Sequence, residues 1–301
     1  MEKLVLKSRR IITKSYGRAM VVACSLALAF TFSVPRAFAQ EETELARANR
    51  AIANPLTNNT LFITEFDTAR YSGDAVNGDK WGTVAIVEPL IPIGLGDSGW
   101  TLITRPIVPL AFSLDVPQGD GTTTSRTGIG DIAVFGLFTK GMNEKGFQWG
   151  VGPILQMPTA TNNDLGSEKW SAGPAAIMVY NTSLRRDRDL TVGLLNQNFF
   201  SFAGDSDRKS VDRSTLQYFA TWSITDNWGL LSAPTITWDR NADGGEWTIP
   251  VSLGVSYTTK LGDIPTRFVL EPQYFIEQND NYGADWNIRF AIAMFLPKGG
   301  K

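Results

Sequence analysis

The sequence predicts an all-β fold, an antiparallel transmembrane β-barrel of about 12 strands, for residues 59–301. Three observations predict it: an export signal at the N-terminus, a series of segments in which apolar and polar residues alternate, and tryptophans at the ends of those segments. Alternation with a period of two is typical of a strand with one apolar and one polar face. A closed barrel with its apolar face outward can cross a membrane because every backbone group is paired within the protein.

Residues 1–39 have the features of a cleaved secretory signal peptide. Six basic residues stand before an apolar run that extends from Ala19 to Val34. Ala37-Phe38-Ala39 supplies the small residues that a signal peptidase requires, so cleavage is expected before Gln40. A retained transmembrane helix is disfavoured, since it would typically need about 20 apolar residues.

A second interpretation of this region is lipidation. Val21-Val22-Ala23-Cys24 resembles a lipoprotein-processing site. Only five residues separate Arg18 from Cys24, however, and the apolar run continues beyond the cysteine. We therefore favour removal of Cys24 with the signal peptide.

The composition of the mature chain, residues 40–301, excludes several classes of function. Cys24 is the only cysteine and there is no histidine, so the mature chain contains neither. A Ser-His-Asp relay, a histidine metal site and a disulfide are therefore impossible. Without the seven Lys and Arg and the one Glu of residues 1–39, the totals of 28 and 30 fall to 21 basic and 29 acidic residues, a net charge of −8. That balance argues against nucleic-acid binding, which requires a basic surface.

Twelve segments of the mature chain carry the alternating pattern. It is clearest in Glu246–Tyr257 and recurs in the last segment, Trp286–Leu296. Trp170–Tyr180 is rich in Ala and Gly, and the parity of Asp189–Phe202 cannot be assigned. The other eight segments are Leu61–Tyr71, Trp81–Ile93, Trp100–Phe112, Gly128–Thr139, Phe147–Met157, Ser214–Ser223, Trp228–Trp238 and Pro265–Ile276. Several segments contain prolines, for which bulges are the usual accommodation in an interior strand; among them are Pro89, Pro106, Pro153, Pro250 and Pro272.

The connections between the segments alternate in length. Five are short and turn-like: Gly94–Gly99, Lys140–Gly146, Asn181–Arg188, Thr225–Asn227 and Lys260–Ile264. Six are longer and polar: Ser72–Lys80, Ser113–Thr127, Pro158–Lys169, Ala203–Arg213, Asp239–Gly245 and Glu277–Asp285. Short turns at one end, long loops at the other and an even strand number are the layout of a barrel in the outer membrane of a Gram-negative bacterium. Both chain ends are then expected at the periplasmic end.

The tryptophans give a separate indication of a membrane. Each of the nine lies at or near a segment end, and those whose parity is clear fall on the apolar face. Indole side chains favour the headgroup level of a bilayer, so we expect two aromatic girdles. A soluble β-sandwich would instead tend to bury tryptophan in the middle of strands. The girdle residues are Trp81, Trp100, Trp149, Trp170, Trp222, Trp228, Trp238, Trp247 and Trp286.

Charged residues on the polar parity are expected to face the interior of the barrel. Hairpin registers place Glu88 opposite Arg105, and Glu271 next to Arg289, because cross-strand neighbours lie about 5 Å apart. Glu65 is expected beside Glu88. The pore-lining candidates are Glu65, Glu88, Arg105, Asp131, Arg213, Arg267, Glu271 and Arg289, and the same parity holds for Asp67 and Gln273.

Two interpretations of these charges remain open. They could pair off and fill a narrow barrel, since a buried unpaired charge is costly. They could instead form a charged constriction that selects what passes. Pairing is the simpler interpretation for any single pair. A ring of mixed sign would not strongly prefer cations or anions.

Other chemistry finds little support in the sequence. The loop pairs Asp205/Asp207 and Asp239/Asp243 carry oxygen ligands that suit calcium, but they lack an ordered loop motif and are better explained as solvated loops. Hydrolysis by a carboxylate pair is conceivable, yet no residues are singled out for it. We expect no metal, no cofactor and no enzymatic activity.

Residues 40–58 form a lead before the first strand. Glu41 to Ala53 is rich in Ala, Glu and Arg, which predicts a short helix that ends at Asn54-Pro55. Such a segment either closes the periplasmic mouth or remains an ordinary flexible lead. The sequence gives no reason to prefer closure.

Several stretches resemble a known family. They are Trp100-Thr-Leu-Ile-Thr-Arg-Pro-Ile-Val-Pro, Gly128-Ile-Gly-Asp, Trp149-Gly-Val-Gly-Pro, Pro158-Thr-Ala-Thr, Lys169-Trp170-Ser-Ala-Gly-Pro, Ser201-Phe-Ala-Gly-Asp, Glu246-Trp-Thr-Ile-Pro, Asp285-Trp and Phe295-Leu-Pro-Lys. Over about Ala53 to Lys298 the chain is similar to bacterial outer-membrane β-barrels grouped as "phenol meta-pathway degradation" or "transporter", some of which carry the misleading label neuromedin U. One departure is the tail from Pro297 to Lys301, because outer-membrane barrels usually end on a terminal aromatic residue.

The resemblance implies an outer-membrane transporter for aromatic or other small hydrophobic compounds, and it supplies no catalytic residues. Together with the residues themselves, it predicts a porin-like channel for passive passage of a small solute. The alternative is a non-conducting structural or surface-interaction barrel; a lipid-modifying enzyme is disfavoured by the missing histidine. The expected partners are outer-membrane lipid, an unidentified solute and the barrel assembly machinery.

Overall fold

The structure is a computed structural model that describes residues 43–182, 189–242 and 246–296. Four predictions concern residues outside these ranges: the signal peptide with Cys24, part of the Asn181–Arg188 turn, Asp243, and the tail after Leu296. The described elements are α2 (Glu44–Ala53), β1 (Thr60–Ser72), β2 (Lys80–Gly94), β3 (Trp100–Pro117), β4 (Thr123–Ile129), β5 (Ala133–Lys140), β6 (Phe147–Gln156), β7 (Lys169–Asn181), β8 (Leu190–Gly204), β9 (Asp212–Ser223), β10 (Trp228–Ser232), β11 (Thr235–Asp239), β12 (Glu246–Ser252), β13 (Gly254–Leu261), β14 (Ile264–Glu277) and β15 (Gly283–Leu296), with two 3₁₀ turns, η1 (Gly96–Ser98) and η2 (Asn163–Leu165). Within the described ranges, none of the helices has the length and apolar character that a membrane crossing would need.

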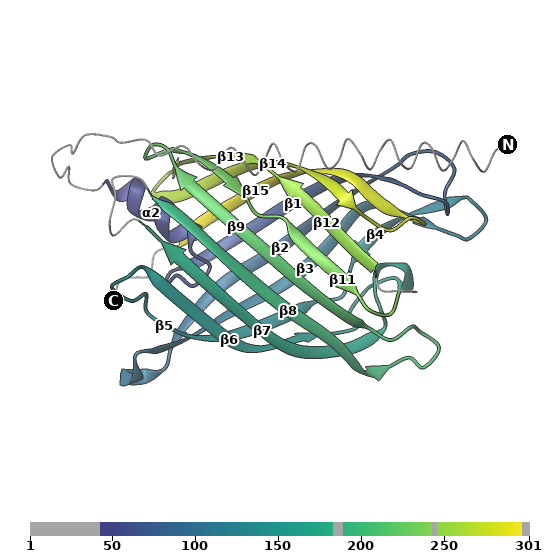
Figure 1. Ribbon diagram of the computed structural model, residues 1–301, viewed down its shortest axis with the longest axis horizontal. Helices are drawn as coiled ribbons and strands as arrows, with labels where there is room; N and C mark the ends of the chain where they lie inside the picture. Colours follow the sequence, from purple (N-terminus) through teal and green to yellow (C-terminus); the bar gives the residue numbers. More distant parts are fainter. Residues whose placement is uncertain (1–42, 183–188, 243–245, 297–301) are drawn as a thin grey trace. The chain divides into compact units, whose positions relative to one another are not determined.

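The β segments form a closed antiparallel barrel of 12 strands (Figure 1). Three strands consist of two pieces each: β4 with β5, β10 with β11, and β12 with β13. Each strand pairs with the next along the chain, and β15 pairs with β1 over the whole length of β1 to close the ring. The predicted fold class and strand number are confirmed.

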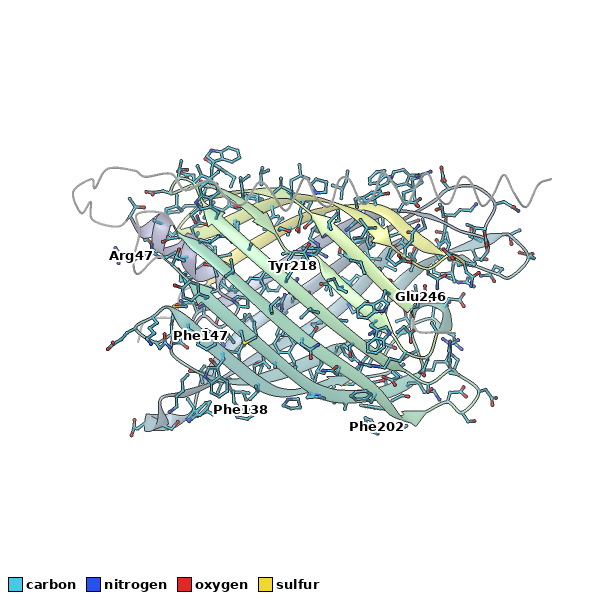
Figure 2. The ribbon with its side chains drawn as sticks, in the orientation of Figure 1. Arg47, Phe138, Phe147, Phe202, Tyr218 and Glu246 are labelled. Carbon is cyan, nitrogen blue, oxygen red and sulfur yellow. The ribbon has the colours of Figure 1, made fainter. Side chains whose placement is uncertain are left out.

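The outer wall of the barrel is apolar. In β12 and β13 the side chains of Trp247, Val251 and Val255 are exposed, whereas Ser256 and Thr258 point inward and are buried. The same alternation recurs around the ring, so the outer surface carries aromatic and aliphatic side chains along most strands (Figure 2). A barrel of this kind is stable in hydrocarbon because its backbone is paired internally and its outer side chains are apolar.

Prolines lie where the hydrogen-bonded ladder is disturbed. Between β2 and β3 the paired positions stop at Val87 and resume at Ile91, a stretch that contains Pro89 and faces Pro106. Between β12 and β14 the register shifts at Pro250, which is the expected bulge. A proline has no N–H to donate, so these interruptions follow directly from the sequence.

One predicted loop is shorter than expected. The sequence predicts a long loop over residues 113–127, but β3 continues to Pro117 and β4 begins at Thr123. The extended hairpin keeps cross-strand pairs from Leu114 with Arg126 to Pro117 with Thr123. Polar residues in this stretch do not form an apolar face, so alternation could not reveal a strand that continues beyond the apolar part of the wall.

Candidate functional site

Six charged side chains meet inside the barrel, on the neighbouring strands β14, β15, β1, β2 and β3. Arg289 makes a two-point contact with Asp67, with Nε 2.9 Å from Oδ1 and Nη2 3.0 Å from Oδ2. The same Nε lies 3.3 Å from Oε2 of Glu65. On the adjacent strands, Arg105 forms an ion pair with Glu88. We call this group, together with Glu271, the charged cluster.

Glu271 belongs to the charged cluster and also accepts a hydrogen bond from the backbone of the barrel wall. It is the cross-strand partner of Arg289, and only 1% of its surface is exposed. Its Oε1 accepts hydrogen bonds from the backbone N of Ala233 and from Oγ of Ser252, both at 2.6 Å. In the ladder between β10/β11 and β12/β13 the pairs stop at residue 231 and resume at residue 237. The carboxylate therefore satisfies a backbone N–H that the interrupted ladder leaves free, as a membrane environment requires.

The opposite arc of the barrel has an apolar interior. Inward-facing residues of β5 to β9 are almost completely buried and form one cluster: Phe135, Leu137, Ile154, Ile177, Val179, Leu195, Phe199 and Phe219. In a ring of 12 strands these lie across from β14, β15, β1, β2 and β3, and the same cluster also includes Leu61, Leu90, Ile103 and Ala293 on β1, β2, β3 and β15. The guanidinium of Arg105 lies 5.9 Å from the ring centroid of Phe135 and so connects the two walls. We call the inward-facing apolar residues of β5 to β9 the apolar wall; they lie opposite the charged cluster, and the sequence did not predict them.

Two of the candidate residues lie near the end of the barrel that carries the long loops. Asp131 accepts hydrogen bonds from the N and Oγ of Ser167, both at 2.7 Å, and thereby anchors the loop between β6 and β7. Arg213 donates to Oε1 of Gln156 at 3.2 Å, and its guanidinium lies 4.9 Å from the ring centroid of Phe199. Neither residue makes an ion pair with the charged cluster.

Two clefts open at this same end. One, of about 430 Å³, is lined by residues that include Arg208, Arg213 and Asp239. The other, of about 580 Å³, is lined by residues that include Trp247 and Glu277. The loop carboxylates considered for calcium have local roles here: Asp239 accepts from the backbone of Asn241, as Asp205 does from that of Asp207. The described ranges hold no group of three or more acidic residues suited to a metal ion.

Arg267, the eighth candidate, lies at the end with the short turns, where helix α2 is seated. It is 5% exposed. Its Nη2 donates to the backbone O of Asn49 at 2.6 Å, and both Nε and Nη2 donate to Oδ1 of the same asparagine. Thr258 donates to that Oδ1 as well, at 2.9 Å. The buried guanidinium of Arg267 thus holds the middle of the helix.

Contacts from several strands hold the rest of the lead. Arg50 pairs with Asp189 at 2.7 Å, at the start of β8, and Leu56 is buried against the apolar wall. At its N-terminal end the helix carries Glu44, whose carboxyl pKa is lowered by the hydrogen bond from Lys260. Arg47 of the helix lies at the same end of the barrel as Phe147, while Glu246 lies toward the other end (Figure 2). The lead is therefore an ordered helix placed at the mouth with the short turns.

The tryptophans divide between the two ends of the barrel. Trp100, Trp149, Trp222 and Trp228 lie next to short turns, and Trp81, Trp170, Trp238, Trp247 and Trp286 lie next to long loops. Several form pairs: Trp81 with Trp286 edge to face at 5.0 Å, Trp100 with Trp149 at 6.0 Å, and Trp238 with Trp247 stacked at 5.2 Å.

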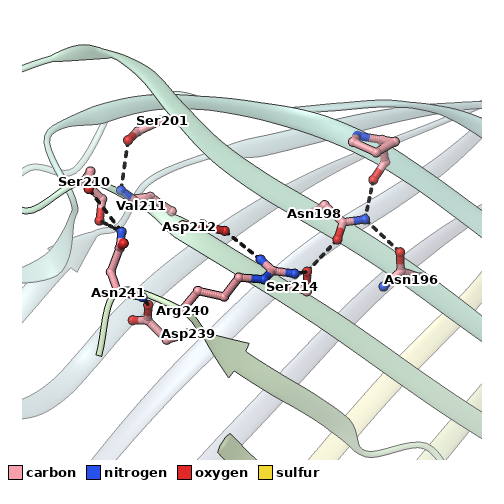
Figure 3. A network of polar contacts seen from close by, with 11 residues as sticks. Asn196, Asn198, Ser201, Ser210, Val211, Asp212, Ser214, Asp239, Arg240 and Asn241 are labelled. Atoms are coloured by element: carbon pink, nitrogen blue, oxygen red, sulfur yellow. Dashed lines mark hydrogen bonds and ion pairs between the residues drawn. The ribbon is translucent and has the colours of Figure 1, made fainter. Parts of the chain in front are cut away.

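A polar network crosses the outer face near the long loops (Figure 3). Arg240 donates to Asp212 at 2.6 Å and to Ser214, whose hydroxyl donates to Asn198. The guanidinium also lies 4.3 Å from the ring centroid of Trp238. These outward-facing polar groups satisfy one another, which reduces the cost of placing them on an apolar wall.

Comparison with known proteins supports the fold. No protein-family model matches the chain, and no curated protein matches it. Among solved structures, the chain is similar to an outer membrane channel from Pseudomonas putida F1, with 14% sequence identity, a TM-score of 0.59, and coverage of 79% of this chain and 96% of that chain. The chain therefore has the fold of an outer-membrane β-barrel.

Two further structures resemble this outer-membrane barrel more weakly. A FadL homologue from Pseudomonas aeruginosa has 10% identity and a TM-score of 0.37, and covers 81% of this chain and 91% of that one. The translocator domain of the autotransporter NalP from Neisseria meningitidis has 12% identity and a TM-score of 0.40, and covers 83% and 92%. The specific family that the sequence resembles stays a prediction.

Proposed function

We propose that this outer-membrane barrel is a channel through which small solutes pass down their own gradient. The observation that supports this proposal is the interior with one charged and one apolar wall. An apolar wall of this kind would bind the apolar or aromatic part of a solute, while the charged wall would orient its polar part. The similar barrel from Pseudomonas putida F1 is itself described as an outer membrane channel.

The candidate residues take three places along this route. Glu65, Glu88, Arg105, Glu271 and Arg289 would line the central part. Asp131 and Arg213 would shape the entrance among the long loops. Asp131 would anchor the loop between β6 and β7, and Arg213 would line one of the two clefts. Arg267 would act at the periplasmic mouth through helix α2.

Helix α2 would keep the periplasmic mouth closed at rest. It is held there by one buried arginine, one partly buried ion pair and two buried aliphatic side chains, Ile52 and Leu56. Displacement of the lead would open the channel. Lipid headgroups would contact the two sets of tryptophans as aromatic girdles, and the barrel assembly machinery would insert the chain.

A non-conducting structural barrel is the second candidate. The seated helix and the almost completely buried apolar wall are the observations that favour it, because both reduce the open space inside. The two candidates differ in one measurable property, which is whether the lumen conducts.

Single-channel recording in a planar bilayer tests the proposal. The refolded mature protein, residues 40–301, should give stable current steps in symmetric potassium chloride. A protein heated until it loses its folded electrophoretic mobility provides the matched control and should give none. A folded, heat-modifiable barrel that never conducts would overturn the channel and support the structural alternative.

A further inference from the structure

We infer that the charged cluster is a cation site, and that the solute class of this channel is a small organic amine with an apolar body. The inference deepens the proposed function, on which it rests. It departs from the expectation that a ring of mixed sign has no strong preference. Three features carry it: the charge balance of the cluster, a free polar atom beside it, and the apolar wall across from it.

The charged cluster has more negative than positive charge. It contains four carboxylates and two guanidiniums. Arg289 is shared between Glu65 and Asp67, and Arg105 pairs with Glu88. Glu271 is held by neutral donors, an amide and a hydroxyl. Two carboxylates therefore lack a full counter-charge, which is costly inside a protein and favours entry of a cation.

A polar atom beside the cluster points to the same ligand. Asn287 is 5% exposed and donates from Nδ2 to Oδ1 of Asp67 at 2.7 Å, which leaves its own Oδ1 as a buried acceptor without a hydrogen-bond partner. A free acceptor beside carboxylates suits an N–H donor, and an ammonium group carries three.

The site is open toward the interior of the barrel. The side chains of Glu65 and Asp67 keep 17% and 19% exposure, although they lie on the inward face of β1. A group in the lumen can therefore reach their oxygens. A compact ammonium could bind these carboxylates without displacing Arg289 from its two-point contact.

The apolar wall defines the rest of the ligand. Arg105 connects the cluster to Phe135, so a ligand bound at the carboxylates would extend toward the apolar wall of β5 to β9. Because these side chains are almost completely buried, the apolar body of the ligand would have to displace side chains that pack against them. An inorganic cation would leave that wall unused. An amine on an aromatic or alkyl body would contact both walls.

Equilibrium binding to the refolded mature protein in detergent tests the inference without requiring conduction. Three probes of similar shape differ in charge: phenethylamine, 2-phenylethanol and phenylacetate. Titration calorimetry should show phenethylamine bound at least about tenfold more tightly than either of the others. Glu65→Gln should reduce amine affinity about tenfold while 2-phenylethanol is unaffected. The Glu65→Gln protein should still fold, because Arg289 retains its two-point contact with Asp67. Glu144→Gln, in an exposed turn, is the matched control and should change nothing.

Equal binding of the amine and the alcohol, or unchanged amine affinity in both Glu65→Gln and Glu271→Gln, would overturn the inference. Competition with potassium chloride gives a further test. If potassium chloride displaces phenethylamine from the protein as effectively as a second amine does, the site binds inorganic cations, and this result would also overturn the solute class. The two proposals fail separately. A barrel that conducts but does not prefer the amine keeps the channel and loses the cation site, whereas one that binds the amine and never conducts loses the channel alone.

Discussion

Replacing Asn49 by alanine should release helix α2 from the mouth of the barrel at the end with the short turns. The substitution removes Oδ1, which accepts from the buried guanidinium of Arg267 and from Thr258, and leaves only the backbone O of residue 49 for the arginine. A hydrogen bond to a charged group contributes about 2 kcal/mol. Loss of that amount shifts the equilibrium between the seated and released helix about 30-fold.

Limited proteolysis measures this shift directly. Trypsin should cleave after Arg47 and Arg50 in the released helix, so the cleavage rate of Asn49→Ala should rise about 30-fold when opening is fast relative to cleavage. The open fraction in single-channel records should rise with it. Asn163→Ala, at an exposed asparagine in η2, is the matched control. Unchanged cleavage and unchanged gating in Asn49→Ala would refute the view that this buried contact holds the helix in place.

Three further predictions concern the lumen, the outer wall and a loop. Arg105→Ala removes the guanidinium that connects the two walls and should change conductance or ion selectivity; identical reversal potentials in a salt gradient would contradict a lumenal role. Trp238→Ala removes a stacked contact with Trp247 and should lower the free energy of unfolding in vesicles by about 1 kcal/mol, measured by urea titration, with no effect if the stacking is incidental. Asp131→Ala removes both acceptor contacts to Ser167 and should speed protease cleavage of the loop between β6 and β7 about tenfold; an equally protected loop would show that Asp131 does not anchor it.

The strand pattern could be predicted because the barrel has a continuous apolar exterior. Segments such as Glu246–Tyr257 alternate strictly, since one face meets lipid and the other carries small polar residues. The segment around β8 could not be assigned a parity for the opposite reason. Phe199 is 4% exposed and its neighbour Phe200 is 44% exposed, so both faces of this strand are apolar. An inner apolar wall erases the alternation on which the assignment depends.

The candidate site could be predicted in part. Register arithmetic brought Glu271 next to Arg289, because regular hairpins preserve the spacing of residues on facing strands. It also placed Glu88 opposite Arg105, and the two side chains form an ion pair although the ladder between β2 and β3 is interrupted there. It gave no prominence to Asp67, which makes the closest contact to Arg289 although it shares the parity of its neighbours.

The position of the lead in the barrel could not be predicted from the sequence, for a different reason. Its helix was predicted from composition, and Thr43 caps it by accepting from the N of residue 46. The position of the helix in the mouth of the barrel depends on the contact between Asn49 and Arg267, which are 218 residues apart in the chain. A single asparagine in a short polar segment carries no signal of so distant a partner.

The ion pairs between β1 and β15 also bear on how the barrel is assembled. Asp67 and Arg289 are separated by 222 residues, and they meet only when the first and last strands join. Until that moment the guanidinium on the last strand has no carboxylate from β1, and hydrocarbon would oppose its entry. We therefore expect ring closure to precede deep insertion of β15. Asp67→Asn should slow the final phase of folding into vesicles more than the earlier ones. A protein truncated before β15 would lack Arg289, so Asp67 would have no arginine partner and the ring could not close.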